Sequence, residues 1–182
     1  MRAFVALCVP EGAKGTAREF QDRWRSAWGR SGVSWTRPEE FHLTLRFLGD
    51  AVEPRVAEAI GRRLLEFESR PSLPCRLEGP LGFPSLRRPT ILALDVSGPP
   101  DLLALADQLD AALHGLGLER RDKPFRPHLT LGRVRDRRLA TPEPPSFGAP
   151  VPFTVARIAL FRSELSPAGS RYEELAAAEF SG

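Results

Sequence analysis

The sequence predicts a mixed fold of strands and helices, built as a single domain (residues 1–182) from two related lobes. The tetrapeptide HLTL occurs at 42–45 and again at 128–131, and these two copies hold two of the three histidines in the chain. Each copy follows a similar apolar segment at nearly the same distance, FVALCV at 4–9 and ILALDV at 91–96. A strand, a helix and an HLTL strand therefore recur in one order, which indicates an internal duplication rather than a longer repeat array.

The first half of the chain alternates between strand and helix patterns. The segments 3–9, 42–49 and 73–79 have the short apolar or alternating pattern that is typical of strands. Helices are predicted at 13–28 and 53–69, where apolar side chains recur at helical spacing: Ala17, Phe20, Trp24 and Ala27 in the first, Val56, Ile60, Leu64 and Phe67 in the second. A loop rich in proline and glycine is expected at 80–89.

The second half repeats the pattern. Strands are expected at 90–96 and 128–134, and between them a helix at 100–117 has proline near its start and glycine at its end. After a proline-rich loop at 141–152, the segments 153–163 and 171–180 are expected to be strands. The alanines and glutamates of the last segment would also suit a helix, so both readings stay open there.

Composition restricts the class of protein. The chain has 182 residues, 42% of them hydrophobic, which is enough to bury a substantial core. No apolar run reaches the roughly 20 residues of a membrane span. The opening segment lacks the pattern of a signal peptide, so we expect a cytoplasmic protein. Cys8 and Cys75 are too few for a disulfide framework or a zinc site, and we expect both to be buried thiols.

The HLTL motif has a definite meaning in a strand. Residues i and i+2 share one face, so His42 and Thr44 point one way while the leucines point the other way. The same parity places His128 beside Thr130. Two such strands on either side of a cleft would bring together two imidazoles and two hydroxyls, with the leucines anchored in the core.

This set of groups suits phosphodiester chemistry. One neutral histidine can take a proton from water while a protonated one delivers a proton to a departing ribose oxygen. Threonine hydroxyls and arginine can stabilise the charge on the phosphate oxygens, so no metal and no other cofactor is expected. Against this, one HxT motif alone is more often a structural strand histidine, and His114, at a predicted helix end, is interpreted as structural.

Positive charge is concentrated around the second motif. The net charge is only +3, but residues 120–138 contain Arg120, Arg121, Lys123, Arg126, Arg133, Arg135, Arg137 and Arg138. Such a run is commonly a solvated face, and beside a phosphate site it also suits an anionic chain such as RNA. Candidates for a stacking contact with a base are Trp35, Phe47, Phe83 and Phe125, and the sequence does not choose among them.

Two segments resemble a known family. WTRPEEFHLTLRFLGD and FRPHLTLGR resemble the two signature segments of the 2H phosphoesterases, and within these the chain is similar to the RNA 2′,3′-cyclic phosphodiesterases, also called 2′–5′ RNA ligases. The opening RAFVALCVP and the tail LFRSELSPAGSRYEEL fit as well, so the resemblance spans essentially the whole chain. It implies a bilobal α+β fold, with two antiparallel sheets around a central cleft and helices outside.

The resemblance also implies residue roles. His42 would protonate the leaving 3′ oxygen and His128 would activate the attacking water, giving a 2′-phosphate. Thr44, Thr130 and Arg133 match family positions that hold the phosphate.

Arg133 conflicts with strand parity, which puts it opposite His128 unless Gly132 introduces a bulge or the strand ends there. Arg46 shares the face of His42 by parity. We follow the family for Arg133, and treat Arg46, Phe47 and Arg126 as weaker candidates for RNA contacts.

The sequence therefore predicts a metal-independent enzyme acting on RNA ends, tRNA fragments among them. The reverse reaction would be 2′–5′ ligation. The alternatives are a 2H phosphoesterase for a small cyclic phosphate, such as ADP-ribose 1″,2″-cyclic phosphate, and a non-catalytic RNA-binding module. We expect a monomer with no obligatory protein partner, because two lobes already supply both halves of the site.

Overall fold

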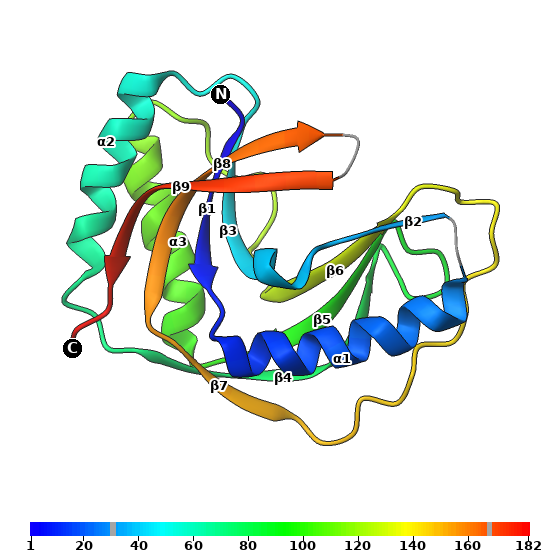
Figure 1. Cartoon of the computed structure of the whole chain (residues 1–182). Helices are drawn as coiled ribbons and strands as arrows, with labels where there is room; N and C mark the ends of the chain where they lie inside the picture. Colours follow the sequence, from blue (N-terminus) through cyan, green and yellow to red (C-terminus); the bar gives the residue numbers. More distant parts are fainter. Residues whose placement is uncertain (30–31, 167–168) are drawn as a thin grey trace.

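Two antiparallel sheets form the framework of the protein (Figure 1). The computed structural model describes residues 1–29, 32–166 and 169–182. Sheet A has the strand order β3-β1-β8-β9, with bounds His42–Gly49, Ala3–Cys8, Arg157–Ser166 and Gly169–Glu179. Sheet B has the order β2-β6-β5-β4-β7, with bounds Val33–Trp35, His128–Val134, Ile91–Ser97, Leu73–Phe83 and Val151–Val155. The fold class is α+β, as predicted.

The two HLTL strands occupy equivalent positions. β3 pairs with β1 in sheet A, where His42 lies opposite Cys8, and β6 pairs with β5 in sheet B, where His128 lies opposite Asp95. β3 and β6 also approach each other across the two sheets. The motifs therefore face a shared space between the sheets, while descent of the two lobes from a duplication stays a prediction.

Three helices cover the sheets in a crossed arrangement. α1 (Glu11–Trp28) follows β1 of sheet A but packs against sheet B, where Gln21 Nε2 donates hydrogen bonds to the carbonyls of Leu131 (2.8 Å) and Thr36 (2.7 Å). α3 (Pro100–His114) follows β5 of sheet B but packs against β3. α2 (Pro54–Leu64) lies on the side of β8 and β9. Each of the helices α1 and α3 thus follows a strand of one sheet in the sequence but covers the other sheet (Figure 1).

Local sequence explains the helix bounds. α2 and α3 both begin at a proline, which fits the first turn because its missing N–H would have no helical partner there. α1 ends at Gly29, whose φ of 75° few other residues adopt. The buried faces follow the predicted periodicity, with Phe20 and Trp24 of α1 and Ile60 and Leu64 of α2 in the core.

Three element predictions need correction, and one strand, β2, was not predicted. Residues 153–163, expected as one strand, are divided at Ala156 into β7 of sheet B and β8 of sheet A. The expected loop 80–89 begins as strand, since β4 continues to Phe83. β2 had no clear sequence signal, and the helix predicted at 53–69 is α2 followed by a 3-10 turn, Leu65–Phe67. The ambiguous C-terminal segment is a strand, β9.

Other expectations concern the surface and the thiols. No helix in the described ranges is long and apolar enough to cross a membrane. Cys75 is buried, as expected, and Cys8 is only partly so. Both cysteines are free thiols.

Candidate active site

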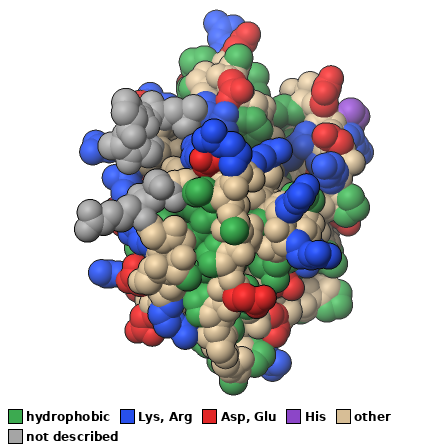
Figure 2. All heavy atoms as spheres, turned by 90° about the vertical axis from the view of Figure 1, so that its right-hand side faces the viewer, with side chains coloured by type: hydrophobic (Ala, Val, Ile, Leu, Met, Phe, Trp, Pro, Cys, Tyr) green, Lys and Arg blue, Asp and Glu red, His purple; other side chains and the backbone are tan. Residues whose placement is uncertain are grey.

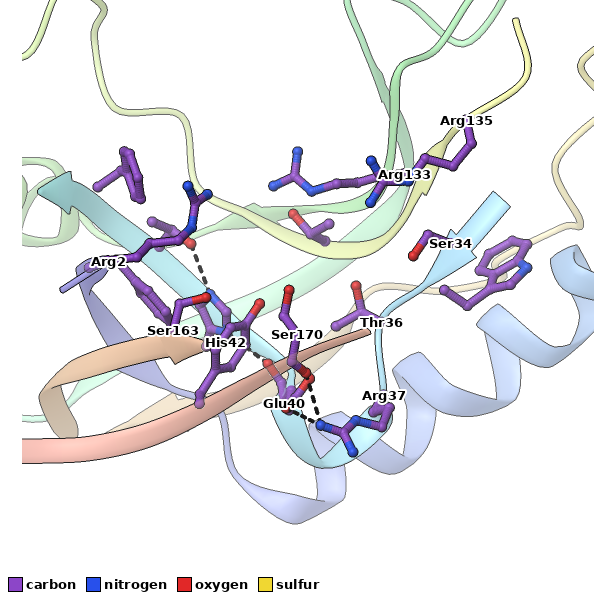
Figure 3. A pocket seen from close by; sticks show the side chains of 16 residues that line it. Arg2, Ser34, Thr36, Arg37, Glu40, His42, Arg133, Arg135, Ser163 and Ser170 are labelled. Atoms are coloured by element: carbon purple, nitrogen blue, oxygen red, sulfur yellow. Dashed lines mark hydrogen bonds and ion pairs between the residues drawn. The ribbon is translucent and has the colours of Figure 1, made fainter. Parts of the chain in front are cut away.

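A cleft of about 530 Å³ lies between the two sheets (Figure 3). Four residues predicted from sequence to act on phosphate contribute to its wall: His42, Thr44, Thr130 and Arg133. They come from β3 of sheet A and from β6 of sheet B. His128 lies two residues before Thr130 in β6, and its charge is close enough to lower the pKa of His42. The structure thus brings together all five residues on which the predicted chemistry depends.

The imidazole of His42 is held on both nitrogens. Nδ1 lies 2.7 Å from the carbonyl oxygen of Glu40, which can only accept, so Nδ1 carries the proton. Nε2 lies 2.9 Å from the hydroxyl of Thr44. The ring stacks on Phe4 at 4.7 Å between centroids, and Tyr172 meets it edge-on at 5.3 Å. The ring is therefore fixed in one tautomer, with Nε2 beside the cleft.

Burial dominates the titration of His42. Loss of solvent around the ring lowers its pKa from the usual 6.5 to about 4. The bond to the Glu40 carbonyl opposes this, since it favours the protonated ring, and the positive charge of His128 adds to the lowering. His42 is therefore neutral near pH 7 in the empty cleft. An anionic phosphate beside Nε2 would raise the pKa again.

His128 is held in the same way. Nδ1 lies 2.7 Å from the carbonyl oxygen of Arg126, also two residues earlier in the chain, so Nε2 is the nitrogen available for proton transfer. Phe83 meets the ring edge-on at 4.8 Å. Burial lowers the pKa of His128, and the charges of Arg126 and Arg133 lower it further, while the carboxylate of Asp95 opposes them. A neutral imidazole with a free lone pair is what a general base requires.

Twin irregularities in the strands decide which side chains reach the cleft. In the β1–β3 ladder Val5 pairs with Arg46 and Ala6 pairs with Thr44, so Leu45 is an extra residue. In the β5–β6 ladder Leu92 pairs with Gly132 and Ala93 pairs with Thr130, so Leu131 is an extra residue. Each bulge falls on the last leucine of HLTL. A bulge reverses the inside–outside alternation of every residue after it.

The bulge at Leu131 resolves the conflict over Arg133. Leu131 and Gly132 are both buried, and Arg133 emerges on the same side as Thr130. The family position for Arg133 is consistent with this geometry, and simple parity is wrong there.

The same geometry overturns the prediction for Arg46. The bulge at Leu45 turns Arg46 toward α3, where its Nε is 3.6 Å from Asp110 Oδ1 and its guanidinium donates to the Glu119 carbonyl. Arg46 does not line the cleft. Phe47 lines it instead, with the guanidinium of Arg2 lying 4.4 Å from the centre of its ring. Phe47 thus takes the position in β3 that Arg133 takes in β6.

Half of the eight cations of the basic run are engaged elsewhere. Arg120, Arg121 and Arg138 form ion pairs with Asp110, Asp107 and Asp136 respectively. Arg126 is exposed, lies 5.6 Å from the centre of the Phe83 ring, and does not line the cleft. From this run, Arg133 and Arg135 reach the cleft wall.

Several functional residues have no signal in the sequence motif itself. The carbonyls of Glu40 and Arg126 are backbone groups, which a residue of any type at these positions would supply. Arg37 donates to Glu40 Oε1 (2.6 Å) and to the Ser170 carbonyl (2.9 Å), which ties the turn before His42 to β9 (Figure 3). Tyr172 lies in the tail segment that resembles the family, but its contact with His42 depends on how β9 packs.

The donor set of the cleft is imidazole, hydroxyl and guanidinium. In the described ranges, no group of three or more His, Cys, Asp or Glu side chains is placed to hold a metal ion. Arg133 and two hydroxyls can surround a phosphate, with the imidazole of His42 in the same wall and His128 two residues before Thr130 in β6. The arrangement can therefore perform paired acid–base chemistry at a bound phosphodiester.

Comparison with known proteins agrees with this geometry. Residues 14–167 match the family model described as the 2′-5′ RNA ligase superfamily. The chain is 33% identical to an RNA 2′,3′-cyclic phosphodiesterase of Archaeoglobus fulgidus, covering 96% of this chain and 98% of that protein. It is 30% identical to one of Thermotoga maritima, covering 100% and 97%. A crystal structure of a Thermus thermophilus protein superposes with a TM-score of 0.79 at 31% identity, covering 99% of this chain and 98% of that one. The chain belongs to the 2′-5′ RNA ligase superfamily.

Proposed function

We propose that this protein is an RNA 2′,3′-cyclic phosphodiesterase that hydrolyses cyclic phosphate ends of RNA to 2′-phosphates without a metal ion. The observation that carries the proposal is the meeting of His42, Thr44, Thr130 and Arg133 in one cleft, with His128 beside them. Relatives with that name match the chain over nearly its whole length, which supports the substrate class.

The reaction would proceed by in-line attack. Nε2 of His128 takes a proton from water as the water oxygen bonds to phosphorus. The bond from phosphorus to the 3′ oxygen breaks, and Nε2 of His42, protonated in the complex, supplies the proton that makes the 3′ hydroxyl. Thr44, Thr130 and Arg133 hold the non-bridging oxygens, where charge increases.

The environments of the two histidines support this assignment. Burial, with the charges of Arg126 and Arg133 added to it, lowers the pKa of His128 and so favours the neutral form that a base requires. His42 is enclosed by aromatic rings and is neutral in the empty cleft, so it gains its proton only when an anion binds beside it. His42 would then carry the catalytic proton only while substrate is bound, so this proton is not lost to water beforehand.

Run in reverse, the same groups would join a 2′,3′-cyclic phosphate to a hydroxyl end and form a 2′–5′ linkage. Because water is present at high concentration, hydrolysis is the expected net direction. Both halves of the cleft come from one chain, which supports action as a monomer.

Turnover of an oligoribonucleotide ending in a 2′,3′-cyclic phosphate, measured in EDTA, tests the proposal. The wild type should form a 2′-phosphate, and His42→Ala and His128→Ala should each abolish turnover. His114→Ala is the matched control, because His114 is exposed at the end of α3 and its Nδ1 contacts only the Leu118 carbonyl. A 3′-phosphate product would show that the 2′ oxygen, rather than the 3′ oxygen, is the leaving group. Absence of turnover by the wild type would refute the proposed phosphodiesterase activity.

A further inference from the structure

The cleft extends well beyond the groups needed for one phosphate. Beside Arg133 its wall includes Ser34 of β2, and past Arg133 it continues to Arg135, which follows β6 (Figure 3). Figure 2 views the molecule from the side where these strand ends lie and shows that Lys and Arg side chains gather in the upper half of this face. The extension is therefore open to solvent and positively charged.

Arg133 and Arg135 lie two residues apart at the end of β6, on the same face. Both are exposed, and half-buried Val134 lies between them. The backbone N–H of Arg135 donates to the Gly32 carbonyl at 2.7 Å, so the extended conformation continues one residue past β6. Residues i and i+2 of a strand are about 6.6 Å apart on one face. Successive phosphates of an extended single strand are separated by a similar distance.

The charges at this end of the cleft are not neutralised. Within the described ranges, neither Arg133 nor Arg135 has a carboxylate within 4.0 Å. Elsewhere in the wall, Arg2 is paired with Asp50 and Arg37 with Glu40. A further phosphate of the substrate is therefore attracted toward Arg135 rather than toward the opposite end.

The indole of Trp35 lies on the other face of sheet B from Arg133 and Arg135. Trp35 pairs with Gly132 in the β2–β6 ladder, and a Cβ atom at Gly132 would lie 3.1 Å from the ring atom Cε3. The absence of a side chain at Gly132 thus lets the indole lie close against β6. The guanidinium of Arg25 lies 5.9 Å from the centre of the ring. Because directly paired residues share a face, the indole packs between β6 and Arg25 of α1 and is not available to a base in the cleft.

We propose that Arg135 forms a second phosphate subsite, which binds the phosphate on the 5′ side of the terminal nucleoside. The inference rests on the proposed function, and it makes the enzyme favour ends that carry this 5′ phosphate, as every RNA chain does. Arg133 binds the cyclic phosphate, so the two arginines read two consecutive phosphates.

Three substrates separate the contributions. Adenosine 2′,3′-cyclic phosphate has no 5′ phosphate, its 5′-phosphorylated form adds the phosphate alone, and the dinucleotide ApA with a terminal cyclic phosphate adds phosphate and base. Arg135→Ala should lower kcat/KM about three- to tenfold for the last two substrates and leave the first unchanged.

Salt dependence supplies a second readout. For the dinucleotide, the slope of log kcat/KM against log salt should be about 0.7 shallower in Arg135→Ala, because one phosphate contact is lost. Arg62→Ala removes the same charge from exposed α2, outside the cleft, and should change neither the substrate ratio nor the slope.

The outcomes distinguish the two proposals. If the wild type turns over all three substrates and Arg135→Ala lowers kcat/KM equally for all of them, or for none, the subsite is overturned. The proposed phosphodiesterase activity then stands. No turnover of any substrate by the wild type would overturn the proposed function and the subsite with it. Selective loss on the phosphorylated and dinucleotide substrates is the result we expect.

Discussion

Replacing Tyr172 by alanine should raise the pKa of His42 by roughly 1 unit. Three aromatic rings surround this imidazole, with centroids at 4.7 Å for Phe4, 5.3 Å for Tyr172 and 6.4 Å for Phe161. Burial is the main cause of the low pKa of about 4. Phe4 and Tyr172 both line the cleft, but Phe4 is buried whereas Tyr172 is half-buried, so removal of Tyr172 admits water to the edge of the ring.

The magnitude follows from the share of the enclosure that is removed. Complete exposure would return the pKa of His42 to its ordinary 6.5, a rise from about 4 that corresponds to roughly 3.4 kcal/mol at 1.36 kcal/mol per unit. Tyr172 is one of three rings, so about a third of this, roughly 1 unit, should be recovered. The backbone bond to Glu40 is unaffected, and the tautomer should stay the same.

NMR titration of histidine-labelled protein measures the shift directly. The chain has three histidines, so His114→Ala and His128→Ala suffice to assign the signals. Tyr172→Phe is the matched control, because it keeps the ring and removes the hydroxyl, and it should leave the pKa of His42 in place. The reasoning would be refuted if His42 of the wild type titrated near 6.5, or if Tyr172→Ala left its pKa unchanged.

Two further predictions concern stability and the bulges. The pKa of His42 is lower in the folded chain, about 4, than in the unfolded chain, 6.5, so the unfolded state binds more protons and stability falls as pH drops through this range. His42→Asn should lose about 3 kcal/mol less than the wild type between pH 7 and pH 4 in urea unfolding, and parallel pH curves would contradict this. Arg133→Ala should lower kcat about 100-fold, with the free energy of unfolding changed by less than about 0.5 kcal/mol. Arg46→Ala should do the opposite, costing about 1–3 kcal/mol of stability at the buried Asp110 with kcat/KM unchanged, and equal kinetic losses in the two variants would restore simple strand parity.

The repeated motif was the strongest information in the sequence. Because side-chain direction in a strand alternates residue by residue, HLTL alone predicts His42 beside Thr44 and His128 beside Thr130, with the leucines inside. Recurrence of the motif in the same strand–helix frame then predicts two strands facing one cleft. These inferences depend only on local geometry, and the structure agrees with them.

Where hydrogen-bond pairing between strands decides the outcome, sequence reasoning failed. The extra residues Leu45 and Leu131 are defined by the strands beside them, and they reverse the faces of Arg46 and Arg133. At Ala156 the chain passes from β7, which pairs with β4 at the edge of sheet B, to β8, which lies between β1 and β9 in sheet A. Both outcomes are set by partners distant in the chain, which no local pattern specifies.

The sequence by itself determined the chemical groups of the site: two imidazoles, two hydroxyls and a nearby excess of arginine. Only the tertiary structure decided what each group can do. It gave His42 a carbonyl partner and an aromatic enclosure that lowers its pKa to about 4, and it turned Arg133, but not Arg46, into the cleft. The physical reason is that the identity of a side chain is local, whereas its solvation, tautomer and direction depend on neighbours brought together by folding.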